Sequence, residues 1–319
     1  MAEVTGGQVQ AATPAAVERL AGLRSQKPRS LWSDAWRQFR HHRLALLGVG
    51  VLVVIVLATL IGPLVWPIPW NVFDMAQAMQ PPSLQHPFGT SDLGYDMLAR
   101  VLWGGRISIA VGIVAMLVSI FLGTTIGSLA GYFGGLIDSL LMRLTDLFIS
   151  LPSLPLLLLV TYLFRDRMKA IFGLQLGTFI LIVTVIGALN WMPVARLVRA
   201  SFLSIKQKEF IEAAHCIGVP TLSIIVKHIL PNTLSPVIVA ATLGVAEAII
   251  TESALSFLGL GFPPDIPTWG RLLYDGQNMI EFAPWMVIFP GLAIFLTVLC
   301  INYVGDGLRD ALDPRRMNV

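Results

Sequence analysis

Long runs of uncharged residues alternate with short polar segments along this chain. The six longest runs hold between 18 and 31 residues and lie at 44–73, 107–137, 147–164, 170–195, 228–246 and 282–305. A helix that crosses a bilayer needs about 20 predominantly apolar residues. The pattern therefore predicts six spanning helices, at approximately 45–66, 107–131, 139–163, 175–195, 234–258 and 284–305.

The composition agrees with a chain that is embedded in lipid. Its 319 residues are 55% hydrophobic and 13% charged, with a mean hydropathy of +0.74. A soluble domain carries roughly twice that charged fraction. The first apolar run starts only at Leu44, after a long polar leader, so it is predicted to be an anchor and not a cleavable signal peptide. We expect an all-α integral membrane protein in which Cys216 and Cys300 are reduced.

The distribution of Lys and Arg predicts the orientation of the chain. If the N-terminus is cytoplasmic, the inner segments hold 16 of these residues and the outer segments hold 6, although a short loop at 165–169 opposes the trend. Because cytoplasmic loops carry the excess of Lys and Arg, both termini are predicted to be cytoplasmic. The net charge of +3 then reflects topology, and nothing in it indicates nucleic-acid binding.

The segment before the second span divides into three parts. Residues 1–43 are expected to be cytoplasmic, with a disordered stretch rich in Ala, Gly and Gln over residues 1–30. Residues 30–43 space their apolar side chains as a helix does, which predicts an amphipathic helix at the membrane surface; a basic anchor for the first span, 44–66, is the alternative. Residues 67–105 are predicted to form an extracytoplasmic loop that is too rich in Pro and aromatic residues for a linker.

Several polar or helix-breaking residues fall inside the predicted spans. Pro152 and Pro155 are expected to kink the third helix, either beside a transport pathway or as part of ordinary bundle packing. Glu247 and Glu252 lie in the fifth span, where ionisable groups face a cavity, a partner or the interface. Glu247, nearer the middle, is the better cavity candidate, whereas the interface or solvent accounts for Glu252 near the outer end. Three charged residues near the start of the third span are expected to be interfacial anchors: Asp138, Arg143 and Asp146.

The largest internal polar segment, 196–233, contains a first short amphipathic helix. Three of its residues, Phe210, Ile211 and Ala214, are expected to group on one side. The small side chains of Ala213 and Ala214 allow another protein surface to approach this helix closely. Gly218 permits a bend after it.

A second amphipathic piece follows the bend. Its apolar residues recur at helical spacing, at Leu222, Ile225, Val226 and Ile229. Pro220 suits the first turn of this helix, and the dipeptide 231–232 is expected to end it before the next span. The two pieces predict a compact helix-turn-helix on the cytoplasmic face, which either docks another protein or only tethers two spans.

The motifs of several enzyme classes are absent from the sequence. There is no G-x-x-x-x-G-K-[ST] loop for ATP phosphates, no H-E-x-x-H or paired C-x-x-C for zinc, and no G-x-S-x-G elbow. We therefore expect no catalytic residues, no metal ligands and no cofactor bound by this chain. A stand-alone secondary transporter or channel that uses Glu247 as its ion site is an alternative that these residues leave open.

The stretch "EAAHCIGVPTLSIIVKHILPN" resembles the EAA loop of permease subunits of binding-protein-dependent ABC importers. The loop covers residues 209–232 here, and its matching positions are Glu212, Ala213, Ala214, Gly218, Leu230, Pro231 and Asn232. Three further stretches, "HPFGTSDLGYDMLARVLWGGRISIAVG", "LMRLTDLFISLPSLPLLLL" and "ESALSFLGLGFPPDIPTWG", are similar to dipeptide, oligopeptide and nickel permeases. The N-terminal segment and the "DALDPRR" tail are similar to the second, C-type permease of such systems. The resemblance covers roughly residues 30 to 316; Tyr95 departs from it, because an Arg is frequent at that position.

The resemblance implies a type I ABC importer permease fold with six transmembrane helices, a transmembrane domain over residues 106–307 and a cytoplasmic tail over residues 308–319. It implies a location in the cytoplasmic (inner) membrane and three kinds of partner. These are a second homologous permease, two cytoplasmic ATP-binding subunits that use ATP and Mg, and an extracytoplasmic substrate-binding protein. In such an importer the EAA helix, centred on residues 212–218, couples ATP hydrolysis in the partner to transport.

The resemblance also implies which spans line the pathway and what passes through it. Spans two to five are expected to line it, with Glu247, Asn190 and Thr251 as candidate lining residues. The expected substrates are dipeptides, oligopeptides or a related small solute such as a nickel complex or glutathione.

Overall fold

The computed structural model describes residues 31–313. The disorder expected for residues 1–30 and the last six residues of the expected tail lie outside this range. From residue 31 to residue 313 the regular elements are helices; no strand forms, and pairing of strand type is limited to two isolated bridges. The prediction of an all-α fold is confirmed.

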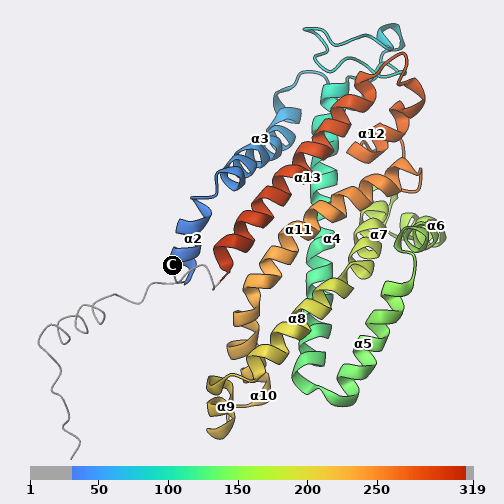
Figure 1. The fold of residues 1–319 in the computed structure, drawn as a ribbon. Coiled ribbons are helices and arrows are strands. Elements are labelled where there is room, and N and C mark those ends of the chain that lie inside the picture. The colour runs from blue at the N-terminus through green and yellow to red at the C-terminus, as the bar shows by residue number, and fades with distance from the viewer. Residues whose placement is uncertain (1–30, 314–319) are drawn as a thin grey trace, which may run out of the picture.

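The helices pack side by side as an elongated bundle (Figure 1). In chain order they are α2 (Leu31–Phe39), α3 (Arg43–Val65), η1 (Met75–Gln77), α4 (Met97–Phe133), α5 (Gly135–Ser150), α6 (Ser153–Phe172), α7 (Leu174–Leu189), α8 (Trp191–Lys206), α9 (Glu209–Cys216), α10 (Thr221–Ser223), η2 (Ile224–Ile229), α11 (Leu230–Phe257), α12 (Trp269–Gly276), η3 (Gln277–Met279) and α13 (Trp285–Leu312).

Four helical segments among the described residues are long and apolar enough to cross a membrane. They are Arg43–Val65, Met97–Phe133, Thr221–Phe257 and Trp285–Leu312. The pairs α5 with α6 and α7 with α8 also pass that test, but they are bent by 89° and 43° respectively. The six predicted spans are therefore present if each bent pair counts as one span.

The third span is broken and is not the single kinked helix that was predicted. Pro152 precedes α6, and Leu151 before it adopts an extended conformation, at φ −78° and ψ 139°. A proline excludes its preceding residue from the helical region, so the chain turns here by 89°. The expected loop at 165–169 is instead part of α6, which continues to Gly173 at φ 80°.

The second span begins at Met97, about three turns before the first charge-free residue that marked its start in the sequence. Asp96 caps this helix by accepting from the N–H of Ala99 at 2.7 Å. Arg106 lies inside the helix and donates from Nε to the carbonyl of Thr59 on α3, at 2.7 Å. A charged side chain can lie inside a helix when a neighbouring carbonyl accepts its hydrogen bond. The charge-free interval in the sequence therefore underestimates the length of this helix.

The fifth span begins earlier than predicted because the helix continues through Pro231. Residues 224–229 form a π-helix, in which the N–H of Leu230 reaches the carbonyl of Ile225. Proline lacks an N–H, and here it lies next to the position where the hydrogen-bond register changes, so the helix does not end. The side-chain amide of Asn232 donates to the carbonyl of His228 at 2.6 Å, which supports the same turn.

Helices α4 and α8 approach each other most closely through a row of glycines. Gly123, Gly127 and Gly131 recur every four residues along α4. A Cβ on Gly123 would lie 2.6 Å from the Cβ of Val194, and a Cβ on Gly131 would lie 2.6 Å from that of Phe202. Only glycine permits this separation, so α4 and α8 form one unit.

Helix α2 covers part of the expected amphipathic segment and packs against α13. Ala35 and Phe39 are buried beside Ala311, whereas Trp36 is exposed. One part of the apolar side of α2 therefore packs against α13, and the part with Trp36 is exposed.

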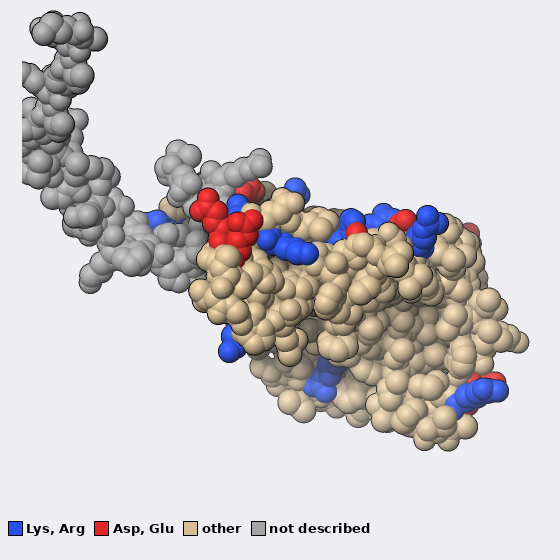
Figure 2. Space-filling view, turned by 90° about the horizontal axis from the view of Figure 1, so that it is seen from below, with Lys and Arg blue, Asp and Glu red and all other residues tan. Residues whose placement is uncertain are grey.

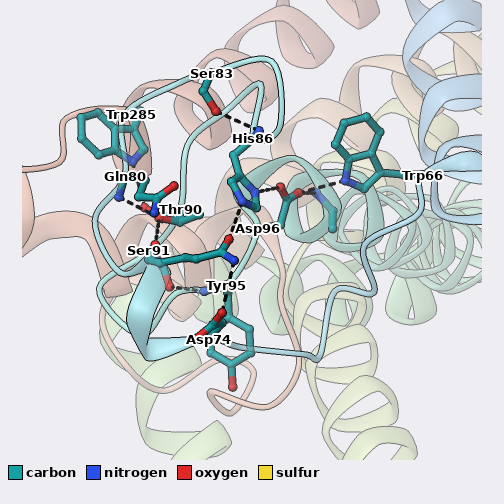
Figure 3. A network of polar contacts seen from close by, with 12 residues as sticks. Trp66, Asp74, Gln80, Ser83, His86, Thr90, Ser91, Tyr95, Asp96 and Trp285 are labelled. Carbon is teal, nitrogen blue, oxygen red and sulfur yellow. Dashed lines mark hydrogen bonds and ion pairs between the residues drawn. The ribbon is translucent and has the colours of Figure 1, made fainter.

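The segment between α3 and α4 folds into a compact cap at one end of the bundle (Figures 1 and 3). Asp96 lies at its centre, where it accepts from Trp66 Nε1 at 3.2 Å and pairs with His86 Nδ1 at 2.8 Å. His86 Nε2 meets the side-chain oxygen of Gln77 at 2.7 Å. Trp285, at the start of α13, donates from Nε1 to the carbonyl of Thr90 at 2.9 Å. The cap thus connects the ends of α3, α4 and α13.

Replacing Asp96 by Ala is expected to lower the thermal unfolding midpoint of the purified protein. Loss of the helix cap alone costs about 0.5–2 kcal/mol. The change also leaves the part-buried N–H of Trp66 and the buried imidazole of His86 without this hydrogen-bond partner. Asp265→Ala is the control, because Asp265 is exposed, and it should leave the midpoint unchanged. Equal midpoints for the two variants would contradict a central role for Asp96.

Candidate functional site

The candidate site is α9 with the turn that follows it, at the end of the bundle opposite the cap (Figure 1). Two residues separate the end of α8 from the start of α9, and α9 leads through Gly218 into α10. Residues 209–218 therefore form a short element between two long helices, as the sequence predicts.

A glycine cap ends α9. Gly218 adopts φ 77°, a left-handed conformation. Its N–H donates to the carbonyl of His215 at 3.0 Å, and the N–H of Val219 donates to that of Ala214 at 3.1 Å. These two bonds make a Schellman motif. A Cβ on Gly218 would meet nothing within 4 Å, so backbone conformation and not space requires the glycine here.

One side of α9 is fixed to the bundle. Ile211 and Ala214 are buried in a cluster that includes Phe202 of α8 and Ile224 and Ile229 of the π-helix. Phe210 was expected to group with Ile211 and Ala214, but it is 48% exposed and lies away from them. The predicted stripe of the second piece also differs, because Leu222 and Val226 are exposed. The wider π turn shifts side chains away from the directions that a regular α-helix gives them.

The other side of α9 forms an exposed surface of mixed character, here called the α9 surface. It comprises Glu209, Phe210, Glu212, Ala213, Ile217 and Leu222. Ile217 is 80% exposed and Leu222 is 72% exposed, beside two carboxylates. Figure 2, which views this end of the molecule, shows most charged side chains along one edge and a broad uncharged area beside them. Exposed apolar groups rimmed by polar residues mark contacts with another protein or with a membrane.

The structure places the predicted EAA residues in two groups. Glu212, Ala213 and Gly218 are exposed, whereas Ala214 is buried against the bundle. The other group, Leu230, Pro231 and Asn232, lies at the start of α11, beyond the π-helix. The two groups belong to different helices, so only the first contributes to the α9 surface.

The candidate pathway residues are not brought together into one polar cluster. Glu247 is exposed on α11, and Thr251, one turn later, donates from its hydroxyl to the carbonyl of Glu247 at 2.8 Å. Asn190 is half-buried at the break between α7 and α8. Among the described residues, no hydrogen bond joins Asn190 to either of the other two.

Glu252 was expected at the interface or in solvent, and this expectation is wrong. Its side chain is fully buried, and its carboxyl group accepts from Ser256 Oγ at 2.7 Å and Ser108 Oγ at 3.3 Å. Ser108 in turn accepts from the N–H of Trp269 at 3.2 Å. The chain folds back after α11 and covers this position with α12. Glu252 therefore joins α11 to α4 and α12, a role that only long-range contacts reveal.

Groups that could hold a metal ion do not occur in the part of the chain that the structure describes: no three His, Cys, Asp or Glu residues gather there. Of the two free cysteines, Cys216 is exposed on α9 and Cys300 is buried in α13.

Two family models match the chain. The model described as "Binding-protein-dependent transport system inner membrane component" matches residues 123–318. The model described as "N-terminal TM domain of oligopeptide transport permease C" matches residues 30–82. The first match includes α9 and all of its supporting helices from α5 onward.

Curated relatives align with nearly the whole chain. The oligopeptide transport system permease protein OppC of Escherichia coli K12 is 44% identical over 289 residues, which is 90% of this chain and 92% of that protein. The dipeptide transport system permease protein DppC of Alkalihalophilus pseudofirmus is 39% identical and covers 90% of each chain. The glutathione transport system permease protein GsiD of Pectobacterium atrosepticum is 38% identical, over 92% of this chain and 94% of that protein.

A solved structure shares the fold. A chain of the MetNI methionine ABC transporter, in an inward-facing conformation, matches with a TM-score of 0.55 at 19% identity. The match covers 68% of this chain and 98% of that chain. The family models, the near-complete alignments and this shared fold agree with one another. This chain belongs to the family of binding-protein-dependent transport system inner membrane components, the permeases of ABC importers.

Proposed function

We propose that this chain is a permease subunit of an ATP-driven importer that carries dipeptides, oligopeptides or a related small solute across the cytoplasmic membrane. The α9 surface is the main observation behind this proposal. It is accessible to a partner, and Ile211 and Ala214 on the opposite side of α9 attach it to two long helices. The names of the relatives, which are oligopeptide, dipeptide and glutathione permeases, support small peptides as the substrate class. The sequence has no phosphate-binding loop of its own, so the energy comes from a separate ATPase.

The partners and the orientation follow from this proposal. The α9 end faces the cytoplasm, where two ATP-binding subunits dock and use ATP and Mg. Both termini lie on that side, in agreement with the excess of Lys and Arg. A second homologous permease completes the membrane part, and a substrate-binding protein delivers the solute at the cap end.

The α9 surface couples the ATPase to the spans in this proposal. The buried side of α9 contacts Phe202 of α8 and Ile224 and Ile229 before α11, so a displacement of α9 is passed to both helices. The spans then rock between inward-open and outward-open states. Glu247, Asn190 and Thr251 are proposed to line the pathway, which agrees with their exposure or partial exposure in the single chain.

Co-purification and uptake test the proposed function. A tagged chain expressed with its native operon should bring down an ATPase and a second, related permease. Vesicles that contain this complex should take up peptide only with ATP and the binding protein. Uptake by the chain alone, without nucleotide, would contradict the importer and would favour a secondary transporter that uses Glu247.

Substitution of Gly218 tests the coupling role of α9. Gly218→Val forces a β-branched residue into the left-handed region, which costs roughly 1–2 kcal/mol. We expect ATP-driven uptake to fall about five- to thirtyfold while the amount of protein in the membrane stays constant. Gly218→Asn is the matched control, because Asn tolerates this conformation, and it should keep most of the uptake. Normal uptake by the Val variant would show that the geometry of this cap does not matter for transport.

A further inference from the structure

Helix α5 is only loosely packed into the rest of the chain. Of its sixteen residues only Thr145 is buried, and its apolar side chains Leu136, Leu140 and Leu147 are largely exposed. Two glycines with positive φ, 68° at Gly134 and 55° at Gly135, form its start, and the 89° break to α6 follows its end. Helix α5 is therefore a short helix set between a glycine turn and a sharp bend.

Two ion pairs join α5 to α8. Arg199 donates from Nε to Asp138 Oδ1 at 2.5 Å and from Nη2 to Oδ2 at 2.6 Å, which is a bidentate contact. Arg196 donates to Asp146 Oδ1 at 2.5 Å through one nitrogen. The first pair is partly buried, with side-chain exposures of 33% and 17%, whereas the second pair is 50% and 62% exposed. Asp138 and Asp146 thus pair with α8, and their role as interfacial anchors stays a prediction.

Within residues 31–313, these two ion pairs are the only hydrogen-bonded side-chain contacts that α5 makes with another helix. Phe148 adds one aromatic contact, at 6.4 Å between its ring centroid and that of Trp191 on α8. A bidentate Arg-carboxylate contact fixes orientation as well as distance. The Asp138–Arg199 pair therefore sets the position of α5 more firmly than the exposed second pair does.

Helix α8 also connects directly to the proposed coupling helix. It is held against α4 by the glycine row, and Lys206 at its end donates to the carbonyl of Tyr132 at 2.6 Å. Helix α9 follows α8 after two residues. A displacement of α9 must therefore move α4 and α8 as one body, whereas α5 follows only through the turn and the bend at its ends and through its side-chain contacts.

We propose that α5 is a strut that passes the movement of α8 to α6, and that Asp138 and Arg199 are positioning residues for the transport cycle. The proposal rests on the proposed function, because it assumes that a partner ATPase displaces α9. Loss of the pair uncouples α5 from α8 without affecting the α9 surface, so the ATPase still binds and hydrolyses ATP while less solute moves per ATP.

A charge swap in the complete, reconstituted complex tests this proposal. The variants are Asp138→Arg, Arg199→Asp and the double variant with both changes; uptake and ATP hydrolysis are measured together. Each single variant should lower uptake per ATP by about five- to tenfold, as expected when a coupling contact is lost. The double variant restores an Arg–Asp pair in reverse order and should recover uptake per ATP to within about threefold of the parent.

The matched control is Arg143→Asp, which changes charge on α5 by the same amount as Arg199→Asp does on α8. Arg143 is exposed and makes no ion pair among the described residues, so this variant should behave like the parent. Asp138→Asn, which keeps the size of the side chain, serves if Asp138→Arg does not assemble, and it should give an intermediate loss of uptake per ATP.

The outcomes separate this proposal from the proposed function. If the parent complex shows no ATP-driven uptake, the proposed function fails. If the parent is active but the single variants retain full coupling, or the double variant assembles and is no better than the single variants, the strut proposal alone is overturned.

Discussion

The contact between α4 and α8 is the constraint on which the position of α9 depends. In a bilayer, lipid tails are as apolar as the side chains, so helices associate mainly through close van der Waals packing. Gly123, Gly127 and Gly131 bring the backbones together, and a side chain at any of them would collide with Val194, Ala195 or Phe202. This contact also determines where α9 lies, because only two residues separate α9 from α8. The attachment of α5 is of the opposite kind, since it depends on charged side chains between a glycine turn and a sharp bend.

The sequence predicted much of the fold because charge-free intervals mark the lipid-facing helices. Its errors occurred where polar groups are satisfied inside the bundle. Arg106 lies within α4 because carbonyls of α3 accept its hydrogen bonds, so the start of this helix was placed too late. Glu252 is buried because α12, far along the chain, folds over it. Such contacts join distant residues, and no local pattern encodes them.

The candidate site was located in the sequence by the EAA resemblance and by the glycine that ends α9. The burial of Ile211 and Ala214 on one side of α9 agrees with the sequence pattern, whereas the exposure of Leu222 and Val226 was not predicted, because the π-helix over residues 224–229 shifts the side chains of that segment. The helix through Pro231 was missed for the same reason, since a proline ends a regular α-helix but is accepted where the hydrogen-bond register changes. The pairing of Asp138 with Arg199 was missed because the two residues lie 61 positions apart.

The cap has a geometric consequence for the opposite end of the molecule. Trp66, Asp96 and Trp285 tie the ends of α3, α4 and α13 to one folded segment, and Phe88 stacks on Phe289 with ring centroids 3.9 Å apart. These three helix ends cannot separate from one another without unfolding that segment. In the proposed importer, we therefore expect an opening at this face to form beside these three helix ends and not between them.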